Sequence, residues 1–417
     1  MCLLRKCISV IFIVWIMITT GCADHPSGSE EKKDSTFASG TFGYDLSFLK
    51  SHDDVIVLSD DKDQSKLIVS PKYQAKVFTS TAGGDSGQSF GWINYKAFAG
   101  TPNTHMNAYG GENRIWLGPE GGKYSLFFTR GSKMVFDNWK TPAAFDTEAW
   151  NVISKSKGKV SLRKEMSLQN YAGTDLQLVV NRSISLIPRG QLFSILDLSP
   201  DDSVQAIGYE AQNTITNSGK FDWNEKTGMP CIWMLDMFKP SENTVILIPY
   251  KNASDSASKI ATTNYFGEIP PARLKHSHGI LFFRADGRNR GKVGLDPGRA
   301  TRFAGSYDES HQILTIAYFD LDASAKYLNQ EWSTVKPSFS GDAVNAYNDG
   351  PLADGTQMGP FYEIESVSPA AFLKPGESLL HRHSVFHFTG TQSGLNKITE
   401  AVFHISIDQI NAAFQGF

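Results

Sequence analysis

The sequence predicts a mainly β protein, built as one large antiparallel two-sheet β-sandwich with a few short helices. Three observations carry this prediction. Short runs of β-branched and aromatic residues recur, clusters of Gly, Pro, Asn and Asp separate them, and no strand–helix–strand alternation occurs. The runs cover residues 54–58, 66–70, 124–128, 176–186, 244–248, 279–283, 313–318, 361–367 and 379–388.

Two segments are expected to be helical instead. Residues 322–332 predict a short helix, because acidic and small residues cap the segment. Residues 393–414 predict two short helices, the second beginning near Ser406 with Asp408 in its first turn, where a negative charge stabilises a helix. No linker divides residues 45–390, so we expect residues 45–417 to form a single domain.

The N-terminus predicts export and lipidation. A short positive segment precedes an apolar run over residues 8–18, which is about half the length of a membrane-spanning helix. Small residues at 19–21 then lead directly to Cys22, an arrangement that resembles the lipobox of bacterial lipoproteins. We therefore expect a signal peptide over residues 1–21 and a lipid anchor on Cys22. The alternative is an ordinary signal peptide with an incidental cysteine.

The composition of the rest of the chain fits an exported globular domain. Residues 22–44 are expected to be a flexible tether, since their polar first part cannot bury enough apolar surface to become ordered. Of four cysteines, only Cys231 lies beyond Cys22, so no disulfide is expected. A formal charge of −3 gives no basic surface for nucleic acid. The expected protein is a monomer held in the bacterial cell envelope, facing the periplasm or the cell surface.

Several motifs together resemble one protein family. The set is similar to an uncharacterised family of bacterial lipoproteins that is grouped with the galactose-mutarotase-like (aldose-1-epimerase-like) proteins, and the resemblance covers roughly residues 45–415. It implies the β-supersandwich fold and a carbohydrate ligand. Similarity to true mutarotases is confined to residues 111–115 and 362–377. The motifs of the set are residues 71–77, 90–95, 110–122, 213–217, 233–238, 305–308, 345–351 and 359–366.

Two late strands carry the candidate catalytic residues. Because side chains alternate along a strand, Glu363 and Glu365 share one face, and His381 and His383 share another. If the strands form a hairpin, one register pairs Glu365 with His381 and Glu363 with His383. Mutarotation needs a base for the anomeric hydroxyl and an acid for the ring oxygen, which carboxylates and imidazoles can supply. The resemblance implies Glu363 or Glu365 as the base, with His105 or His381 as the candidate acid.

Two further segments predict substrate binding. Arg114 can bond a carboxylate or sugar hydroxyls through two donors, Trp116 can present a flat ring to a pyranose, and Glu120 is a further candidate. The turn over residues 345–351 offers oxygen atoms to a sugar or to calcium, the only cofactor the sequence suggests. A basic cluster at 288–292 is expected at a solvated hairpin end or against an acidic sugar. The predicted substrate-binding residues are Glu112, Asn113, Arg114, Trp116, His383, Asn345 and Asp349.

The sequence leaves three functions open. One is a sugar isomerase of the mutarotase or epimerase type, and another is a carbohydrate-binding lipoprotein without catalysis. The third is a polysaccharide lyase or glycosidase, in which paired carboxylates act on a glycosidic bond. Each candidate residue also has a structural interpretation: cross-strand pairs for the glutamates and histidines, core packing for Trp116, and a simple turn for 345–351. A glutamate beside a histidine in an open cleft would favour the enzyme.

Overall fold

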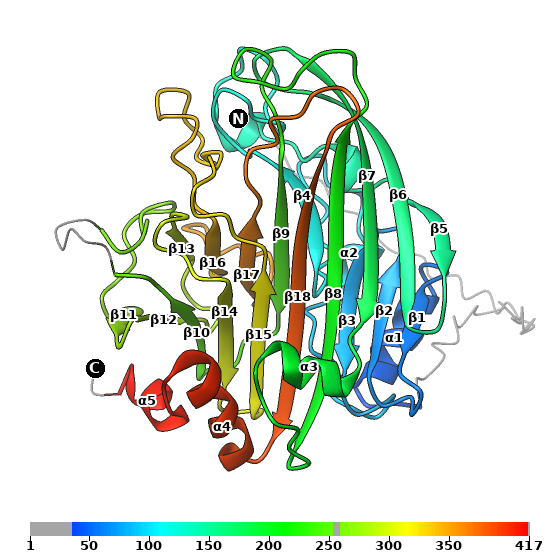
Figure 1. Cartoon of the computed structure of the whole chain (residues 1–417), viewed down its shortest axis with the longest axis vertical. Helices are drawn as coiled ribbons and strands as arrows, with labels where there is room; N and C mark the ends of the chain where they lie inside the picture. Colours follow the sequence, from blue (N-terminus) through cyan, green and yellow to red (C-terminus); the bar gives the residue numbers. More distant parts are fainter. Residues whose placement is uncertain (1–35, 253–258, 416–417) are drawn as a thin grey trace, which may run out of the picture. The chain divides into compact units, whose positions relative to one another are not determined.

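The computed structural model describes residues 36–252 and 259–415, and their strands form three antiparallel sheets (Figure 1). The predicted mainly β architecture is confirmed. The largest sheet has ten strands in the order β11-β12-β10-β14-β15-β18-β8-β7-β6-β5. These are β5 (Asn151–Lys155), β6 (Lys159–Gln169), β7 (Asp175–Leu186), β8 (Val204–Asn217), β10 (Thr244–Pro249), β11 (Leu274–Ser277), β12 (Ile280–Arg284), β14 (Phe303–Asp308), β15 (Ile313–Phe319) and β18 (Ser378–Gly390).

A five-stranded sheet faces the ten-stranded one, and the first three strands of the chain form a separate three-stranded sheet. The five-stranded sheet has the order β13-β16-β17-β9-β4 and the smaller one the order β1-β2-β3. Their strands are β1 (Ile56–Ser59), β2 (Lys66–Ser70), β3 (Lys76–Thr81), β4 (Arg114–Gly118), β9 (Cys231–Phe238), β13 (Gly291–Leu295), β16 (Val344–Asn348) and β17 (Tyr362–Val367). The helices are α1 (Phe42–Lys50), α2 (Tyr95–Ala99), α3 (Arg189–Ile195), α4 (Gln392–Phe403) and α5 (Ile407–Ala412), with 3-10 turns η1 (Phe136–Asn138) and η2 (Ala143–Phe145).

The hydrophobic core lies on both faces of the ten-stranded sheet. One cluster fills the space between the two larger sheets, where Ile184 and Val385 pack in the same core as Met234 and Ile364. A second cluster covers the other face of the ten-stranded sheet beneath α3, α4 and α5, which Figure 1 shows at the lower end of the strands. Apolar and polar residues therefore alternate along a long strand of the ten-stranded sheet only where one face of the strand is exposed to solvent, as in β7.

The C-terminal helices confirm the prediction for residues 393–414. Thr391 caps α4 by accepting a hydrogen bond from the Gly394 amide. Ser406 and Gln409 form a reciprocal capping box at the start of α5, and Asp408 lies in its first turn. Each cap satisfies an amide that the helix itself leaves without a partner.

Two local predictions were wrong. Residues 124–128 form no strand, because their amides are used in turns: Ser125 N donates to Gly122 O and Leu126 N to Pro119 O. Their large apolar side chains are nonetheless core residues. Residues 322–332 form turns and no helix, with Asp322 accepting from Ser324 instead of capping a longer segment.

The folded domain also begins before the predicted boundary at residue 45. Phe42 is the first residue of α1 and is fully buried, so the predicted tether (22–44) overlaps the domain at its end. Residues 1–35, which contain the predicted signal peptide and Cys22, lie outside the described residues. In the described part of the chain no helix is long and apolar enough to cross a membrane.

Candidate active site

The outer face of the five-stranded sheet, the face turned away from the ten-stranded sheet, collects the predicted glutamates. Cross-strand neighbours share a face, so the register can be followed from strand to strand. One row runs from Lys292 through Tyr347 to Glu363. The next row runs from Asn345 through Glu365 and across β9 to Arg114. Residues from four strands thereby meet in one polar cluster.

Glu365 is the fully buried centre of this cluster. Lys292 Nζ donates to both carboxylate oxygens, at 3.0 and 2.8 Å, and Trp233 Nε1 donates to Oε2 at 2.8 Å. The Lys292 ammonium also lies 4.8 Å from the centre of the Trp233 ring. Three donors suit an ionised carboxylate, which is an acceptor only.

Glu363, two residues earlier on β17, has a different environment. Arg114 Nη2 donates to Glu363 Oε1 at 2.6 Å, and the guanidinium lies over the Trp116 ring at 5.2 Å. Burial raises the pKa of Glu363 well above the ordinary range of a carboxyl; the charge of Glu365 adds to the shift and Arg114 opposes it. Two neighbouring carboxyls in such different surroundings, with the pKa of Glu363 raised, are a typical arrangement for acid–base chemistry.

The cluster keeps a small contact with the surface. Arg114, Glu363, Lys292 and Tyr347 retain between 6 and 8% of their surface, whereas Glu365 retains none. Glu120 is only half-buried and interacts with Lys292. Burial raises the pKa of Glu120, and the Lys292 charge opposes the increase. A third carboxyl therefore stands between the cluster and solvent.

Tryptophans form one side of the cluster. The Trp116 ring lies 5.6 Å from Trp233 and 6.3 Å from Trp139, which in turn stacks on Trp332 at 6.1 Å. The sequence allowed Trp116 to be either a core residue or a platform for a sugar. Its side chain is 5% exposed, and this value alone does not decide between the two roles. None of the described residues accepts a hydrogen bond from Trp116 Nε1 or Arg114 Nε. Both donors are buried and lack a partner among the described residues.

The opposite side of the cluster is built from β13, β16 and the loops before them. Tyr347 Oη donates to Asp349 Oδ1 at 2.9 Å and accepts from Arg290 Nε at 3.2 Å. Asn345 Nδ2 donates to Tyr265 Oη at 3.4 Å. Asn345 and Asp349, both predicted for substrate binding, therefore border the glutamate face.

Asp342 completes this side through a close approach. Tyr265 donates its hydroxyl proton to Asp342, and burial raises the pKa of Asp342 to about 6. Gly294 makes room for it, because a Cβ at Gly294 would lie 2.0 Å from Asp342 Oδ2. Any side chain at Gly294 would displace this carboxyl.

Lys76 of β3 lies buried close to Arg114. Its ammonium donates to Gly110 O at 2.9 Å. Burial and repulsion by Arg114 lower the pKa of Lys76 to about 7, with Asp146 opposing the shift. The three-stranded sheet thus adds a weakly basic amine behind the cluster.

The predicted glutamate–histidine hairpin was wrong. β17 pairs with β16 and β9, whereas β18 pairs with β15 and β8 in the other sheet. Residues 368–377 cross between the sheets, so the strands are sequence neighbours without being ladder partners. The side chain that meets the histidines is Ser366, on the face of β17 opposite to Glu363 and Glu365.

The histidines form an inner network between the two sheets. Ser366 Oγ lies 2.8 Å from both His381 Nε2 and His383 Nδ1, and His383 Nε2 donates to Asp236 Oδ2 at 2.6 Å. All four side chains are 3% exposed or less. Burial lowers the pKa of His381 to about 3, which keeps its ring neutral. The structure thus separates His381 and His383 from both glutamates.

Glu112 and Asn113 also lie on the inner side. Glu112 accepts hydrogen bonds from Ser80 at 2.7 Å and from His387 at 3.1 Å. Asn113 donates to Asp236 Oδ1 at 2.7 Å and accepts from Arg182. Both residues are fully buried, so the structure does not bring these predicted binding residues to the outer face.

His105, the other predicted acid, lies on a half-buried loop. Its Nδ1 is 2.6 Å from Trp139 O, and its ring stacks on Phe136 at 4.6 Å. Among the described contacts of His105 there is none with Glu363 or Glu365. It lies behind the tryptophans instead of within the cluster.

Lys292, Trp233 and Tyr265 are the cluster residues that sequence reasoning missed. Residues 288–292 were expected at a solvated hairpin end, but Lys292 is 8% exposed and bonds to Glu365. The available signal was the pair of glutamates itself, because two buried carboxyls on one strand face require cations opposite them. Which residues supply these cations depends on the order of the strands in the sheet, and the alternation pattern does not encode that order.

Metal binding gains no support from the described residues. Nowhere in the described chain do three His, Cys, Asp or Glu side chains cluster as a metal site. Asp349, the suggested calcium ligand, accepts from Tyr347 and from the Gly359 amide. Cys231 is buried, and burial raises the pKa of its thiol to about 12, so this cysteine is not a reactive nucleophile.

Comparison with known proteins defines the class first. One similar solved structure is a protein of Synechocystis sp. PCC 6803, with a TM-score of 0.50 and 13% identity over 81% of this chain and 96% of that one. A putative aldose 1-epimerase from Escherichia coli (TM-score 0.49, 13% identity, 80% and 98% covered) and a galactose mutarotase-like protein from Lactobacillus casei (0.47, 12%, 80% and 99%) are also similar. The chain therefore shares its mainly β fold with the Synechocystis protein.

Family membership is more specific. Residues 40–414 match the model of a family of unknown function, DUF6786, and the chain belongs to that family. No curated protein sequence matches the chain significantly. The prediction that the chain belongs to an uncharacterised family is confirmed. That the protein is a lipoprotein stays a prediction.

Proposed function

We propose that the outer face of the five-stranded sheet binds a carbohydrate and exchanges protons at its anomeric centre, as in an aldose 1-epimerase. One observation carries the proposal: Glu363, whose buried carboxyl favours its protonated form, lies two residues from Glu365, which Lys292 and Trp233 hold in place on the same face of β17. The fold class, in which similar structures are named as a putative epimerase and a mutarotase-like protein, agrees with it.

Glu363 is the proposed catalytic residue, because it keeps exposed surface and favours its protonated form. A protonated carboxyl has a donor and an acceptor oxygen. Its O–H protonates the ring oxygen while the C1–O5 bond breaks, and its other oxygen takes the proton of the anomeric hydroxyl, giving the open-chain aldehyde. Rotation about C1–C2 and the reverse transfers then close the ring with the other anomeric configuration.

The neighbours of Glu363 have supporting roles in this proposal. Arg114 stabilises the carboxylate whenever the proton has left Glu363. Glu365, held by Lys292 and Trp233, is a positioning residue whose charge favours protonation of Glu363. The tryptophan rings pack against the buried side of the cluster and hold its polar side chains in place, and the indole N–H of Trp116 is left without a partner among the described residues.

Polarimetry of freshly dissolved α-D-glucose and α-D-galactose tests the proposal. Wild type should accelerate mutarotation, and Glu363→Gln should slow the catalysed rate by about 100-fold or more, the usual contribution of acid–base catalysis. Glu400→Gln, at an exposed position on α4, is the matched control and should equal wild type. Equal catalysed rates for wild type and Glu363→Gln would exclude this role for Glu363.

A second candidate is carbohydrate binding without catalysis. It is favoured by the separation of His381 and His383 from the glutamates, which removes the imidazole acid that the sequence predicted. Tryptophan fluorescence during sugar titration distinguishes the two, because Trp116 and Trp233 line the cluster. Saturable binding together with an unaccelerated mutarotation rate would select the binding protein. Release of reducing ends from a polysaccharide would instead select the lyase or glycosidase alternative.

Export and anchoring through Cys22 are part of the same proposal. The support is the sequence pattern before Cys22. Replacement by serine should release the mature protein from the membrane fraction and abolish incorporation of labelled palmitate. Unchanged fractionation and labelling of Cys22→Ser would contradict the anchor while leaving the sugar chemistry untouched.

A further inference from the structure

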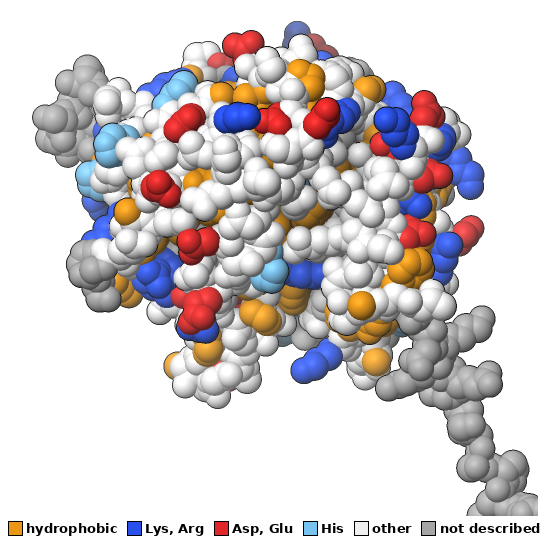
Figure 2. All heavy atoms as spheres, turned by 90° about the horizontal axis from the view of Figure 1, so that it is seen from below, with side chains coloured by type: hydrophobic (Ala, Val, Ile, Leu, Met, Phe, Trp, Pro, Cys, Tyr) orange, Lys and Arg blue, Asp and Glu red, His pale blue; other side chains and the backbone are white. Residues whose placement is uncertain are grey.

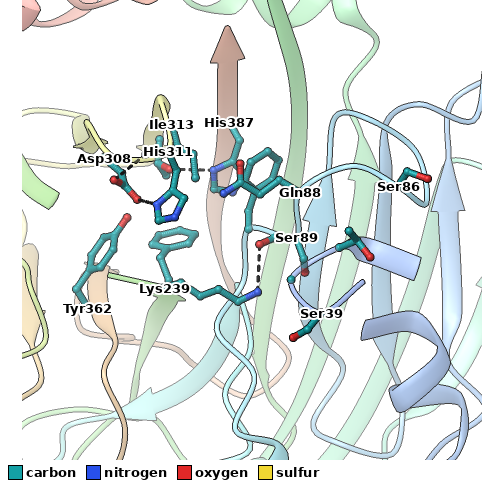
Figure 3. A pocket seen from close by; sticks show the side chains of 15 residues that line it. Ser39, Ser86, Gln88, Ser89, Lys239, Asp308, His311, Ile313, Tyr362 and His387 are labelled. Atoms are coloured by element: carbon teal, nitrogen blue, oxygen red, sulfur yellow. Dashed lines mark hydrogen bonds and ion pairs between the residues drawn. The ribbon is translucent and has the colours of Figure 1, made fainter. Parts of the chain in front are cut away.

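A cavity of about 440 Å³ lies at the lower end of the strands, apart from the glutamate cluster (Figure 3). Its walls come from the ends of both large sheets and from residues 39–41 and 86–90. Figure 2, which views the molecule from below, shows a histidine and a basic side chain side by side near the middle of this face. The volume lies within the range of sites for small molecules.

The cavity and the glutamate cluster are on opposite sides of the five-stranded sheet. Tyr362 lines the cavity, and it points to the inner side, where its hydroxyl lies 2.8 Å from Ser306 Oγ of the ten-stranded sheet. Glu363, the next residue, points outward to Arg114. A ligand in the cavity would therefore not contact the proposed catalytic residue.

The back of the cavity is aromatic. The Phe90 ring stacks on His387 at 4.4 Å and 20°, and Phe238 meets the same imidazole edge-on at 5.4 Å. His387 is fixed by Thr315 at 2.9 Å and by Glu112 at 3.1 Å. Flat rings held in this way give a rigid apolar wall.

The rim of the cavity has hydrogen-bonding groups to spare. The side chains of Ser39 and Gln88 line it, and among the described residues neither has a side-chain partner. A hydroxyl group can donate and accept, and an amide does the same through separate atoms. These groups suit the hydroxyls of a polyol.

Lys239 provides a cation with free donors. Its ammonium donates to Ser89 O at 3.3 Å and stands 3.8 Å from Asp45, and its side chain is 36% exposed. Asp45 is itself bonded to Ser89 and Tyr95 and fully buried, so it is already satisfied. An ammonium has three protons, so Lys239 has donors left for a ligand.

His311 stands on the other side of the cavity, beside Asp308 (Figure 3). Asp308 accepts from His311 Nδ1 at 2.7 Å and from Ser241 Oγ at 2.6 Å. This leaves His311 Nε2, on a side chain that is 54% exposed, for a ligand. The carboxylates of Asp45 and Asp308 are engaged by protein donors, whereas Lys239 has free donors and the Nε2 atom of His311 has no partner among the described residues.

We propose that this cavity is a second ligand site, which takes a hydroxylated carboxylic acid of monosaccharide size, such as a uronic acid. Its carboxylate would bond to Lys239, one hydroxyl would donate to His311 Nε2, other hydroxyls would bond to Ser39 and Gln88, and its apolar face would lie against Phe90. A neutral sugar lacks the charge that Lys239 recognises, and inorganic phosphate lacks the apolar face.

Isothermal titration calorimetry with glucuronate, galacturonate, glucose and inorganic phosphate tests this site. We expect saturable uronate binding that is at least 10-fold tighter than binding of glucose or phosphate. Lys239→Met should weaken uronate binding at least 10-fold, and His311→Gln should weaken it as well. Lys226→Met, at an exposed position elsewhere, is the matched control and should bind as wild type does.

Several outcomes would overturn the proposal: no saturable uronate binding to the wild type, equal affinity in Lys239→Met and His311→Gln, or tighter binding of phosphate than of uronate. Circular dichroism of each variant establishes that it is folded. Glu363→Gln should leave uronate affinity unchanged, because Glu363 faces the other side of the sheet. A lost mutarotase activity and a lost uronate site are therefore distinguishable.

Discussion

The five-stranded sheet carries a polar cluster on each face, and the two clusters differ in how completely they are closed. On the inner face, Ser366, His383 and Asp236 bond to one another between two sheets and are cut off from solvent. On the outer face, Glu363 bonds to Arg114 and Lys292 bonds to Glu365, and both Glu363 and Lys292 keep part of their surface exposed.

This difference teaches which buried polar groups to regard as functional. The inner network contains the residue types expected of an active site, yet it ties the two sheets together and leaves no room for a substrate. Buried networks of this kind stabilise one strand arrangement when all their members are paired. The outer cluster has buried donors without a partner at Arg114 and Trp116, some exposed surface, and a carboxyl that favours its protonated form.

Acid is the strongest way to break the inner network. The folded pKa of His381, about 3, lies below its unfolded value of 6.5, so the unfolded chain binds the extra proton as pH falls through this window. Stability present above pH 6.5 is therefore lost toward pH 3, by roughly 4 to 5 kcal/mol for this shift. Urea unfolding between pH 7 and 3.5 should show this loss in wild type and a smaller one in His381→Gln. Parallel pH profiles for the two proteins would refute the assignment.

Removing the carboxylate of the inner network should be nearly as damaging. Asp236→Ala leaves His383 Nε2 and Asn113 Nδ2 without their acceptor in a dry interior. We expect a decrease of about 3 to 5 kcal/mol in the free energy of unfolding. Asp222→Ala, at an exposed position, should change it by less than about 0.5 kcal/mol. Similar unfolding curves for the two variants would show that the network does not stabilise the sheets.

Lys76, next to the outer cluster, should respond in the opposite direction. Lys76→Met removes a buried charge while keeping the apolar stem, and below pH 7 it should raise the free energy of unfolding by about 2 to 4 kcal/mol after loss of the bond to Gly110 O. Between pH 7 and 10.5, Lys76 holds its proton in the unfolded wild type but not in the folded one, so wild type becomes more stable as the pH rises. The difference in free energy of unfolding between Lys76→Met and wild type therefore becomes smaller. Thermal melts at pH 6 and 9.5 measure both values; a gap that widens with pH would contradict the shift.

The smallest change in stability is expected within the outer cluster itself. Glu365→Gln keeps an acceptor for Lys292 and Trp233 and should cost only about 1 kcal/mol. The comparison with Asp236→Ala then shows whether the outer face is the more tolerant one. Urea midpoints of both variants measured side by side give the answer, and a Glu365→Gln loss above that of Asp236→Ala would reverse the comparison.

The fold and the two glutamates of the outer cluster could be predicted from the sequence, because both depend on patterns within a single strand or helix. Alternation along one strand places Glu363 and Glu365 on one face, and capping residues fix the start of α5. Strand order is not local. Glu365 bonds to Lys292, which is 73 positions away, while His381, which is much nearer in sequence, belongs to the other sheet. The alternation pattern is the same whichever strand lies alongside, so it cannot select a partner.

Cys231 has a practical consequence for all of these measurements. Beyond residue 22 it is the only thiol in the sequence, and it is completely buried at the start of β9, where Gln330 Nε2 lies 3.5 Å from its Sγ. A protein that begins after Cys22 therefore carries one sulfhydryl that reagents reach only when the structure around the start of β9 opens. The rate at which a thiol reagent labels Cys231 in native buffer measures how often that opening occurs. This rate can be measured for any variant without denaturant.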